Sequence, residues 1–225
     1  MIEDMVGGGT GLYTLRETAK YARMSHTTLS RWLKGSSSCE RVFPLEETKI
    51  ITFADFMQVL AVRNLRVLYN VPLQKIREAV DRASKEYGID YPFARKHTTY
   101  LFDRDIWIKP EGVKESDFLV QVSGKSHGQP ALTPVIERFL VDVFYDEKTG
   151  LANRYKAFER NNHQIVMNPK VRFGEPILDN SGYTPGAIFE AAKTEGSVEA
   201  AARMYGLSRE QVEVCIDYFD YLHAA

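Results

Sequence analysis

Hydrophobic positions near the start of the chain recur at intervals of three and four residues, which is the spacing of an amphipathic helix. Two short stripes of this kind lie in residues 13–24 and 25–35, so we expect two short helices joined by a turn. Their apolar members are Leu15, Ala19 and Ala22 in the first helix and Leu29, Trp32 and Leu33 in the second. A pair of helices this short and this tightly joined is typical of a helix-turn-helix.

The second predicted helix has a polar face of hydroxyls and cations. Ser25 is a good N-cap, and Gly35 suits the left-handed position that ends a helix. At 100° per residue, the side chains opposite the apolar stripe are those of Thr27, Ser30, Arg31 and Lys34. A face of this composition is either solvated or in contact with a polyanion.

Residues 36–52 contain turn residues followed by two β-prone segments, RVF and KII, and this pattern predicts a small wing hairpin. Helical spacing returns in residues 53–69 and again in residues 72–87. The first of these helices has Thr52 as a suitable cap, and the second begins at Pro72 and is followed by Gly88.

The middle of the chain changes in character. Aromatic and β-branched residues reach the density of strands in TTYLFDRDIWIK and DFLVQV, and DEKTG has the composition of a hairpin turn. His97, His127 and His163 are scattered without the spacing that a metal site needs. Asp103 and Asp105 share one face of a predicted strand, where they are either solvated or paired for metal or acid–base chemistry.

The last sixty residues predict a short strand and then three helices. Thr184, Ser197 and Ser208 are the expected N-caps, and Gly196 and Gly206 end the first two helices. We therefore expect an α+β protein in four parts. These are a flexible tail (1–12), a winged helix-turn-helix (13–92), a β-rich unit (93–163) and a three-helix domain resembling a second helix-turn-helix (164–225).

Composition narrows the function classes. The 225 residues carry a net charge of −1, which divides into +4 over residues 1–100 and −5 over residues 101–225. A mildly basic front half and an acidic back half favour one end for a polyanion and another end for a different partner. Cys39 and Cys215 are far apart and suggest free thiols in a reducing cytoplasm.

Several other classes find no support in the chain. The opening residues lack the basic and apolar regions of a signal peptide, and no run of apolar residues is long enough to span a membrane. GGGTG is not followed by the Lys of a phosphate loop. No cluster of residues indicates a catalytic site, a metal or a cofactor, so we do not expect an enzyme.

The segment YTLRETAKYARMSHTTLSRWLKG resembles the helix-turn-helix of MerR-type and excisionase-type proteins. The matching positions are Leu15, Glu17, Ala19, Met24, Ser25, Thr28, Leu29 and Trp32. The resemblance implies that the polar face of the second helix enters the major groove of operator DNA, where Arg31 could fork onto a guanine. The candidate DNA-binding residues are His26, Thr27, Thr28, Ser30, Arg31 and Lys34, with Arg41 and Lys49 in the wing.

The C-terminal segment resembles a small domain of VapB-type antitoxins. The resemblance rests on IVMNP, GEPI, SGYTP, the Gly196-Ser197 step and YGLS, with Asn168 in place of the usual Asp. It implies a cytoplasmic antitoxin that neutralises a PIN-like ribonuclease toxin with an acidic metal site and represses its own promoter. Arg154 and Arg172, which we expect to be exposed, are candidate contacts to the toxin's carboxylates.

Two points stay open at this level. The outward residues of the last helices, Glu199, Glu210, Glu213 and Asp217, are acidic and would be repelled by phosphates. This favours a homodimer or partner contact at that end, and the aromatic residues near the C-terminus suit an interface. The alternative function is a MerR-like regulator whose β-rich middle binds a small ligand and which has no toxin partner.

Overall fold

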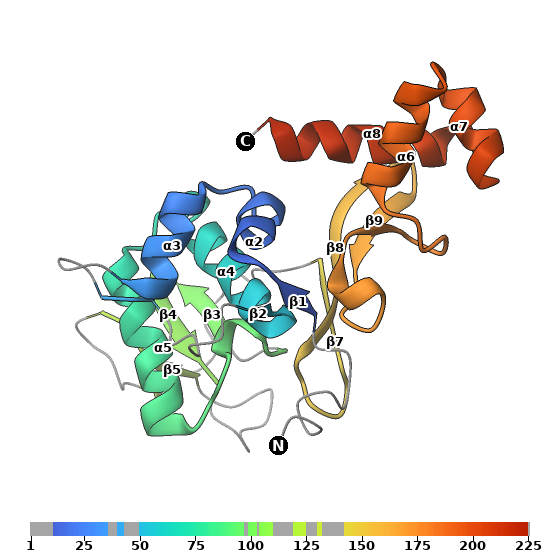
Figure 1. The fold of residues 1–225 in the computed structure, drawn as a ribbon. Helices are drawn as coiled ribbons and strands as arrows, with labels where there is room; N and C mark the ends of the chain where they lie inside the picture. The colour runs from blue at the N-terminus through green and yellow to red at the C-terminus, as the bar shows by residue number, and fades with distance from the viewer. Residues whose placement is uncertain are drawn as a thin grey trace. The chain divides into compact units, whose positions relative to one another are not determined.

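The computed structural model describes residues 11–35, 40–42, 50–96, 99–102, 104–109, 119–124, 130–131 and 142–224. Helices and small antiparallel sheets make up these residues, which confirms the predicted α+β class. The chain forms two compact units (Figure 1). One unit consists of residues 14–141 and 145–152, and the other of residues 1–13, 142–144 and 153–225.

Four helices dominate the first unit. They are α2 (Leu15–Tyr21), α3 (His26–Lys34), α4 (Phe53–Val67) and α5 (Leu73–Tyr87), with the short strand β2 (Ile51–Thr52) before α4. The predicted helix ends are confirmed, because Thr52 caps α4 and Gly88 ends α5 in the left-handed conformation. The interior of this unit is built from the apolar faces of α4 and α5, including Phe56, Met57, Leu65 and Ile76.

A four-stranded antiparallel sheet follows α5 and the 3-10 helix η1 (Pro92–Ala94). Its order is β3 (Thr99–Phe102), β4 (Asp105–Ile108), β5 (Leu119–Gln121) and β6 (Pro130–Ala131). Helix α5 packs against β4, and Lys75 forms an ion pair with Asp105, which also accepts a hydrogen bond from Gln121. Asp105 is thus held by neighbouring side chains, whereas Asp103, His97 and His127 lie outside the described residues.

The predicted wing is described only in part. Arg41 and Val42 lie outside any strand, and the backbone N–H of Val42 donates to the Trp32 carbonyl at 2.7 Å. Residues 36–39 and 43–49, which contain the turn and the start of the KII segment, lie outside the described residues.

The second unit contains a sheet with the order β10-β9-β8-β7. Its strands are β7 (Val143–Tyr145), β8 (Ala152–Arg160), β9 (His163–Met167) and β10 (Ile177–Leu178). The β8–β9 hairpin pairs Arg160 with His163, with a bulge between Lys156 and Phe158. The boundary expected between residues 163 and 164 therefore falls within one hydrogen-bonded sheet. Two further elements belong to this unit, β1 (Leu12–Tyr13) and the 3-10 helix η2 (Arg172–Gly174).

Three helices complete the second unit (Figure 1). They are α6 (Pro185–Thr194), α7 (Val198–Tyr205) and α8 (Arg209–His223), and both α6 and α7 pack against α8. The predicted caps are confirmed at Thr184, Ser197 and Ser208. Helix α8 also packs against β9. The buried residues at this junction include Ile165, Ile188, Val212 and Cys215.

Candidate nucleic-acid interface and partner surface

The connection between α2 and α3 is a tight, well-fixed turn. Arg23 has a φ of 49°, and the Met24 N–H donates to the Ala19 carbonyl at 3.0 Å. Arg63 reaches across from α4, and its Nε donates to the Arg23 carbonyl at 3.3 Å. The turn between the two helices is therefore also held by a contact from a third helix, which sequence spacing does not reveal.

Helix α3 presents the two faces that the sequence predicts. Leu29, Trp32 and Leu33 are buried on one side. His26, Thr27, Arg31 and Lys34 are exposed, and Ser30 is half-buried. The hydroxyl-and-cation face is thus exposed along α3, from His26 in the first turn to Lys34 in the last turn.

Thr28, a candidate DNA-binding residue in the sequence analysis, takes part in the N-cap of α3. The Ser25 hydroxyl donates to Thr28 Oγ1 at 2.8 Å, and Ser25 Oγ accepts from the Thr28 N–H at 3.1 Å. These bonds satisfy the first turn of α3 and hold the Thr28 hydroxyl at the cap. Of the two wing candidates, Arg41 is exposed and Lys49 lies outside the described residues.

Helix α2 carries two exposed cations that the sequence analysis did not single out. Arg16 and Lys20 are four residues apart and both exposed. Between them, Glu17 folds back into a capping box, where its carboxylate accepts from the Thr14 N–H and hydroxyl, both at 2.8 Å. The signal in the sequence was the i, i+4 pair of cations beside the Leu15–Ala19–Ala22 stripe.

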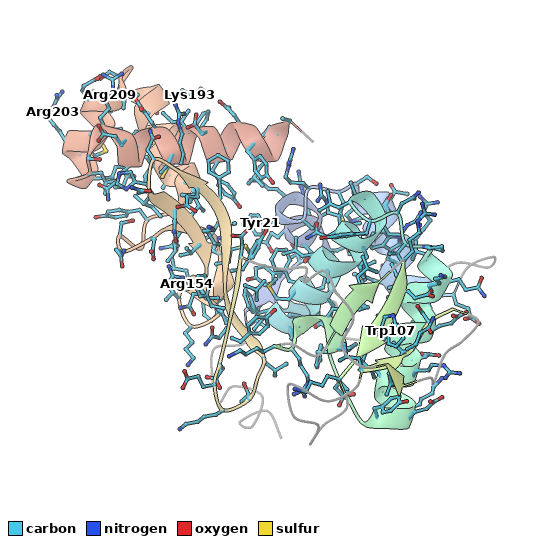
Figure 2. The ribbon with its side chains drawn as sticks, turned by 180° about the vertical axis from the view of Figure 1, so that it is seen from behind. Tyr21, Trp107, Arg154, Lys193, Arg203 and Arg209 are labelled. Atoms are coloured by element: carbon cyan, nitrogen blue, oxygen red, sulfur yellow. The ribbon has the colours of Figure 1, made fainter. Side chains whose placement is uncertain are left out.

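In the second unit, Arg154 does not fit the expectation of an exposed arginine. It is half-buried on β8, and Nη2 forms an ion pair with Asp179 at 2.8 Å (Arg154 is labelled in Figure 2). Its guanidinium also lies 5.3 Å from the centre of the Phe144 ring. Because Arg154 is engaged on both sides, it joins β8 to the loop after β10 rather than projecting to a partner.

Arg172 is exposed, and its neighbours are unusual. Arg172, Phe173 and Gly174 have φ values of 46°, 55° and 87°, three successive residues in the left-handed region. Such a backbone costs about 1–2 kcal/mol for each residue other than glycine. Phe173 is 71% exposed at this point. We call residues 170–174 the 170–174 turn.

The 170–174 turn is held by a hydrogen bond from a buried side chain. The Tyr13 hydroxyl donates to the Gly174 carbonyl at 2.8 Å, and Tyr13 itself is buried. The turn is also closed by its own backbone, since the Gly174 N–H donates to the Val171 carbonyl at 2.9 Å. Arg172 Nε pairs with Glu175 at 3.1 Å, and Lys170 is exposed. The sequence analysis pointed to Arg172 but not to Phe173, because the exposure of Phe173 depends on the backbone conformation of the turn.

The outer faces of α7 and α8 carry fewer free acids than the sequence suggested. Arg209 bridges Glu199 at 2.7 Å and Glu213 at 2.8 Å, and Arg160 pairs with Asp217. The hydrogen bond to Glu213, followed by the charge of Glu199, raises the pKa of Arg209 above its usual range. Arg203 and Arg209 lie at the same end of the helices in Figure 2.

Aromatic rings gather along the last turns of α8. Phe189 and Phe219 stack with centroids 3.9 Å apart, and His223 stacks on Phe219 at 4.2 Å. On another side, Phe158 contacts Tyr221 at 5.2 Å. Tyr221 and His223 are exposed, so part of this cluster faces outward.

The described residues contain no group of three or more His, Cys, Asp or Glu side chains arranged to hold a metal ion. Within the same part of the chain, no helix has the length and apolarity needed to cross a membrane. Cys215 is buried as a free thiol, and burial raises its pKa to about 12.

The described residues form an α+β protein with an exposed cationic face on α3 and a separate three-helix end. A family model described as "Protein of unknown function (DUF433)" matches residues 165–219, from β9 into α8. This match covers the segment that carried the antitoxin resemblance in the sequence.

Individual relatives extend the similarity to nearly the whole chain. A Mycobacterium tuberculosis protein named "Putative antitoxin VapB45" is 24% identical over 92% of this chain and 92% of its own length. A second protein of that organism, "Uncharacterized protein Rv2308", is 23% identical over 92% of this chain and 89% of its own length. The resemblance to VapB-type antitoxins that the motifs predicted is therefore confirmed.

A solved structure shares the fold. The crystal structure of Rv2018 from Mycobacterium tuberculosis matches 91% of this chain and 96% of that chain, with a TM-score of 0.60 and 18% sequence identity. At this identity the likeness concerns the fold alone.

Proposed function

We propose that this chain is the antitoxin of a toxin–antitoxin pair, that its α2–α3 unit binds operator DNA and that its other unit holds the toxin. The name of one relative, an antitoxin, supports the general role. The observation that carries the DNA part is the exposed face of α3, with Thr27, Arg31 and Lys34 opposite a fully packed apolar side.

The α2–α3 pair has the parts that a MerR-like helix-turn-helix needs. In this proposal helix α3 is the recognition helix, and Arg31 forks onto a guanine edge in the major groove. Thr27 and Lys34 suit phosphate oxygens, and His26 lies at the helix N-terminus where anions are favoured. Arg16 and Lys20 on α2 add backbone contacts, and Arg41 and Lys49 contribute from the wing.

The toxin is a PIN-like ribonuclease whose metal site is acidic. Arg172 remains a candidate contact because it is exposed, and its ion pair with Glu175 also lies at the surface, whereas Arg154 is half-buried. Arg154 is a weaker candidate, because its guanidinium already pairs with Asp179.

The chain acts as a homodimer. An operator read by one recognition helix gives limited affinity, and a two-fold dimer doubles the contacts over two half-sites. The outward aromatic residues of α8, including Tyr221, are of the type that concentrates in interfaces.

A MerR-like ligand sensor is the second candidate. Trp107 supports it, because its Nε1 is buried and has no hydrogen-bond partner among the described residues (labelled in Figure 2). A donor of this kind in the β3–β6 sheet suits a small polar ligand.

Co-expression with the product of the adjacent gene, followed by a shift assay on the shared promoter, tests the proposal. A co-purifying ribonuclease together with a salt-sensitive, sequence-specific shift supports the antitoxin function. A specific shift without a partner moves the assignment to the ligand sensor. The absence of any shift contradicts DNA binding by α3.

A further inference from the structure

Tyr13 joins two parts of the chain that lie far apart in the sequence. Its side chain is buried, and its hydroxyl donates to the Gly174 carbonyl in the 170–174 turn. Gly11 lies against the same glycine, because a Cβ built on Gly174 would come within 3.4 Å of the Gly11 Cα atom. Strand β1 therefore packs on the 170–174 turn, and it leads directly into α2 (Figure 1).

No linker separates this anchor from helix α2. Thr14, the next residue, is the N-cap of α2, and both its N–H and its hydroxyl donate to the Glu17 carboxylate at 2.8 Å. The Thr14 carbonyl accepts from the backbone N–H of Thr18 at 2.9 Å and from the Thr18 hydroxyl at 3.0 Å, and Thr18 is fully buried. A displacement of Tyr13 must therefore change either the few backbone dihedrals between two adjacent, fixed residues or the first turn of α2.

The turn at the other end of this connection has a strained backbone. Arg172 and Phe173 both have positive φ, which residues other than glycine rarely adopt. Such a backbone persists only where the surrounding structure fixes it, and it is found at switch regions. The hydrogen bond from Tyr13 is one of the contacts that fix it, together with the bond from the Gly174 N–H to the Val171 carbonyl.

We propose that Tyr13 and Gly174 form a conformational latch, a hydrogen bond that couples the 170–174 turn to the first turn of α2. While the bond is made, the turn keeps its left-handed backbone and β1 holds the start of α2. When the bond breaks, the strained turn relaxes and α2 loses this anchor. Because α2 packs on α3, the latch links a surface turn of the second unit to the pair of helices that carries the candidate DNA-binding residues.

Hydrogen–deuterium exchange of the full chain tests the latch, by comparing the peptides that cover α2 and the 170–174 turn with those that cover α5 and α8. Tyr13→Phe removes the hydroxyl and keeps the ring. Tyr183→Phe is its control, because it removes the hydroxyl of an exposed phenol from the same unit. We expect Tyr13→Phe to speed exchange in both the α2 and the 170–174 peptides by about two- to tenfold, the factor that fits one lost hydrogen bond. Exchange in α5 and α8, and throughout the control variant, should be unchanged.

A second pair of variants tests the latch from the side of the turn. Gly174→Ala places a Cβ 2.0 Å from the Tyr13 hydroxyl oxygen, so it should displace the phenol. Gly182→Ala is the control, since Gly182 also has a positive φ but no atom lies within 4 Å of an added Cβ. The latch predicts faster exchange in α2 for Gly174→Ala and unchanged exchange in α2 for Gly182→Ala.

Two results overturn the latch. If Tyr13→Phe leaves exchange in α2 unchanged, the turn and the helix are not coupled. If it speeds exchange equally in every helix, Tyr13 contributes only to global stability. Either result leaves the function proposed above intact, because the exchange of α2 is measured without DNA and without a partner protein.

Discussion

The hydroxyl of Tyr13 donates a hydrogen bond of 2.8 Å to the carbonyl of Gly174, 161 positions further along the chain. Gly174 has a φ of 87°, and a Cβ built on it would lie 2.0 Å from the Tyr13 hydroxyl oxygen. Two independent constraints therefore require glycine at this position, the backbone conformation and the close approach of a buried phenol.

Replacing Gly174 with alanine tests both constraints. We expect Gly174→Ala to lower the free energy of unfolding by about 2–4 kcal/mol in urea, because strain and overlap add together. Gly182→Ala is the matched control, since Gly182 also has a positive φ of 74° but no atom within 4 Å of an added Cβ. The control should lose only about 1–2 kcal/mol. Equal losses for the two variants would mean that the Tyr13 contact does not constrain Gly174.

Arg31 should determine sequence specificity if it reads a base. Arg31→Ala is then expected to weaken binding to the operator by about 1–3 kcal/mol and to leave nonspecific binding nearly unchanged. Lys34→Ala should weaken binding to all sequences and reduce the dependence on salt. Competition shift assays over a range of salt separate these results. A uniform loss for Arg31→Ala would assign Arg31 to a phosphate.

Arg63 should affect DNA binding without touching DNA. Its Nε holds the Arg23 carbonyl in the turn between α2 and α3. Arg63→Gln is expected to lower promoter affinity severalfold with an unchanged salt slope, because it loosens the angle of the helices and removes no phosphate contact. Lys85→Gln on α5 is the control, as Lys85 is an exposed cation that pairs with Asp81 in its own helix. A reduced salt slope for Arg63→Gln would place Arg63 on the DNA.

Burial of Cys215 should make the stability of the protein fall at high pH. Burial raises its pKa from 9.0 to about 12, so the thiolate forms more readily in the unfolded chain than in the native one. Between pH 9 and pH 12 the unfolded state therefore holds fewer protons, and stability falls as pH rises, by up to about 1.4 kcal/mol per pH unit. Urea unfolding at several values in this range measures the slope.

Cys215→Ala separates the thiol from other groups that titrate in the same range. Tyr145 is one of these, because burial raises its pKa to about 12 as well. The variant should show a shallower fall of stability than the wild type above pH 9. An identical slope would mean that the thiol does not titrate differently in the two states.

Local signals in the sequence predicted much of the fold. Ser25, Thr52 and Ser208 cap helices as expected, because a cap depends on a hydroxyl and on the three residues after it. The two faces of α3 followed from helical spacing in the same way. Each of these features depends on residues that lie within about one helical turn of each other in the sequence.

The features that the sequence did not predict depend on distant contacts. Arg154 was expected to be exposed, but Asp179, 25 positions later, forms an ion pair with it. The conformation of Phe173 depends on the fold around Tyr13 and Gly174. The predicted boundary between residues 163 and 164 lies within β9, whose pairing with β8 depends on residues on both sides of that boundary.

The second unit is discontinuous, since Tyr13 belongs to it while residues 14–141 form the first unit. During synthesis, the first unit can complete its helices as soon as its own residues emerge. Tyr13 must wait until Gly174 has been made before it finds its acceptor, and loop closure over 161 positions is entropically slow. We therefore expect the proposed DNA-binding surface to mature before the 170–174 turn, so that a nascent or truncated chain can display α3 without yet presenting Phe173.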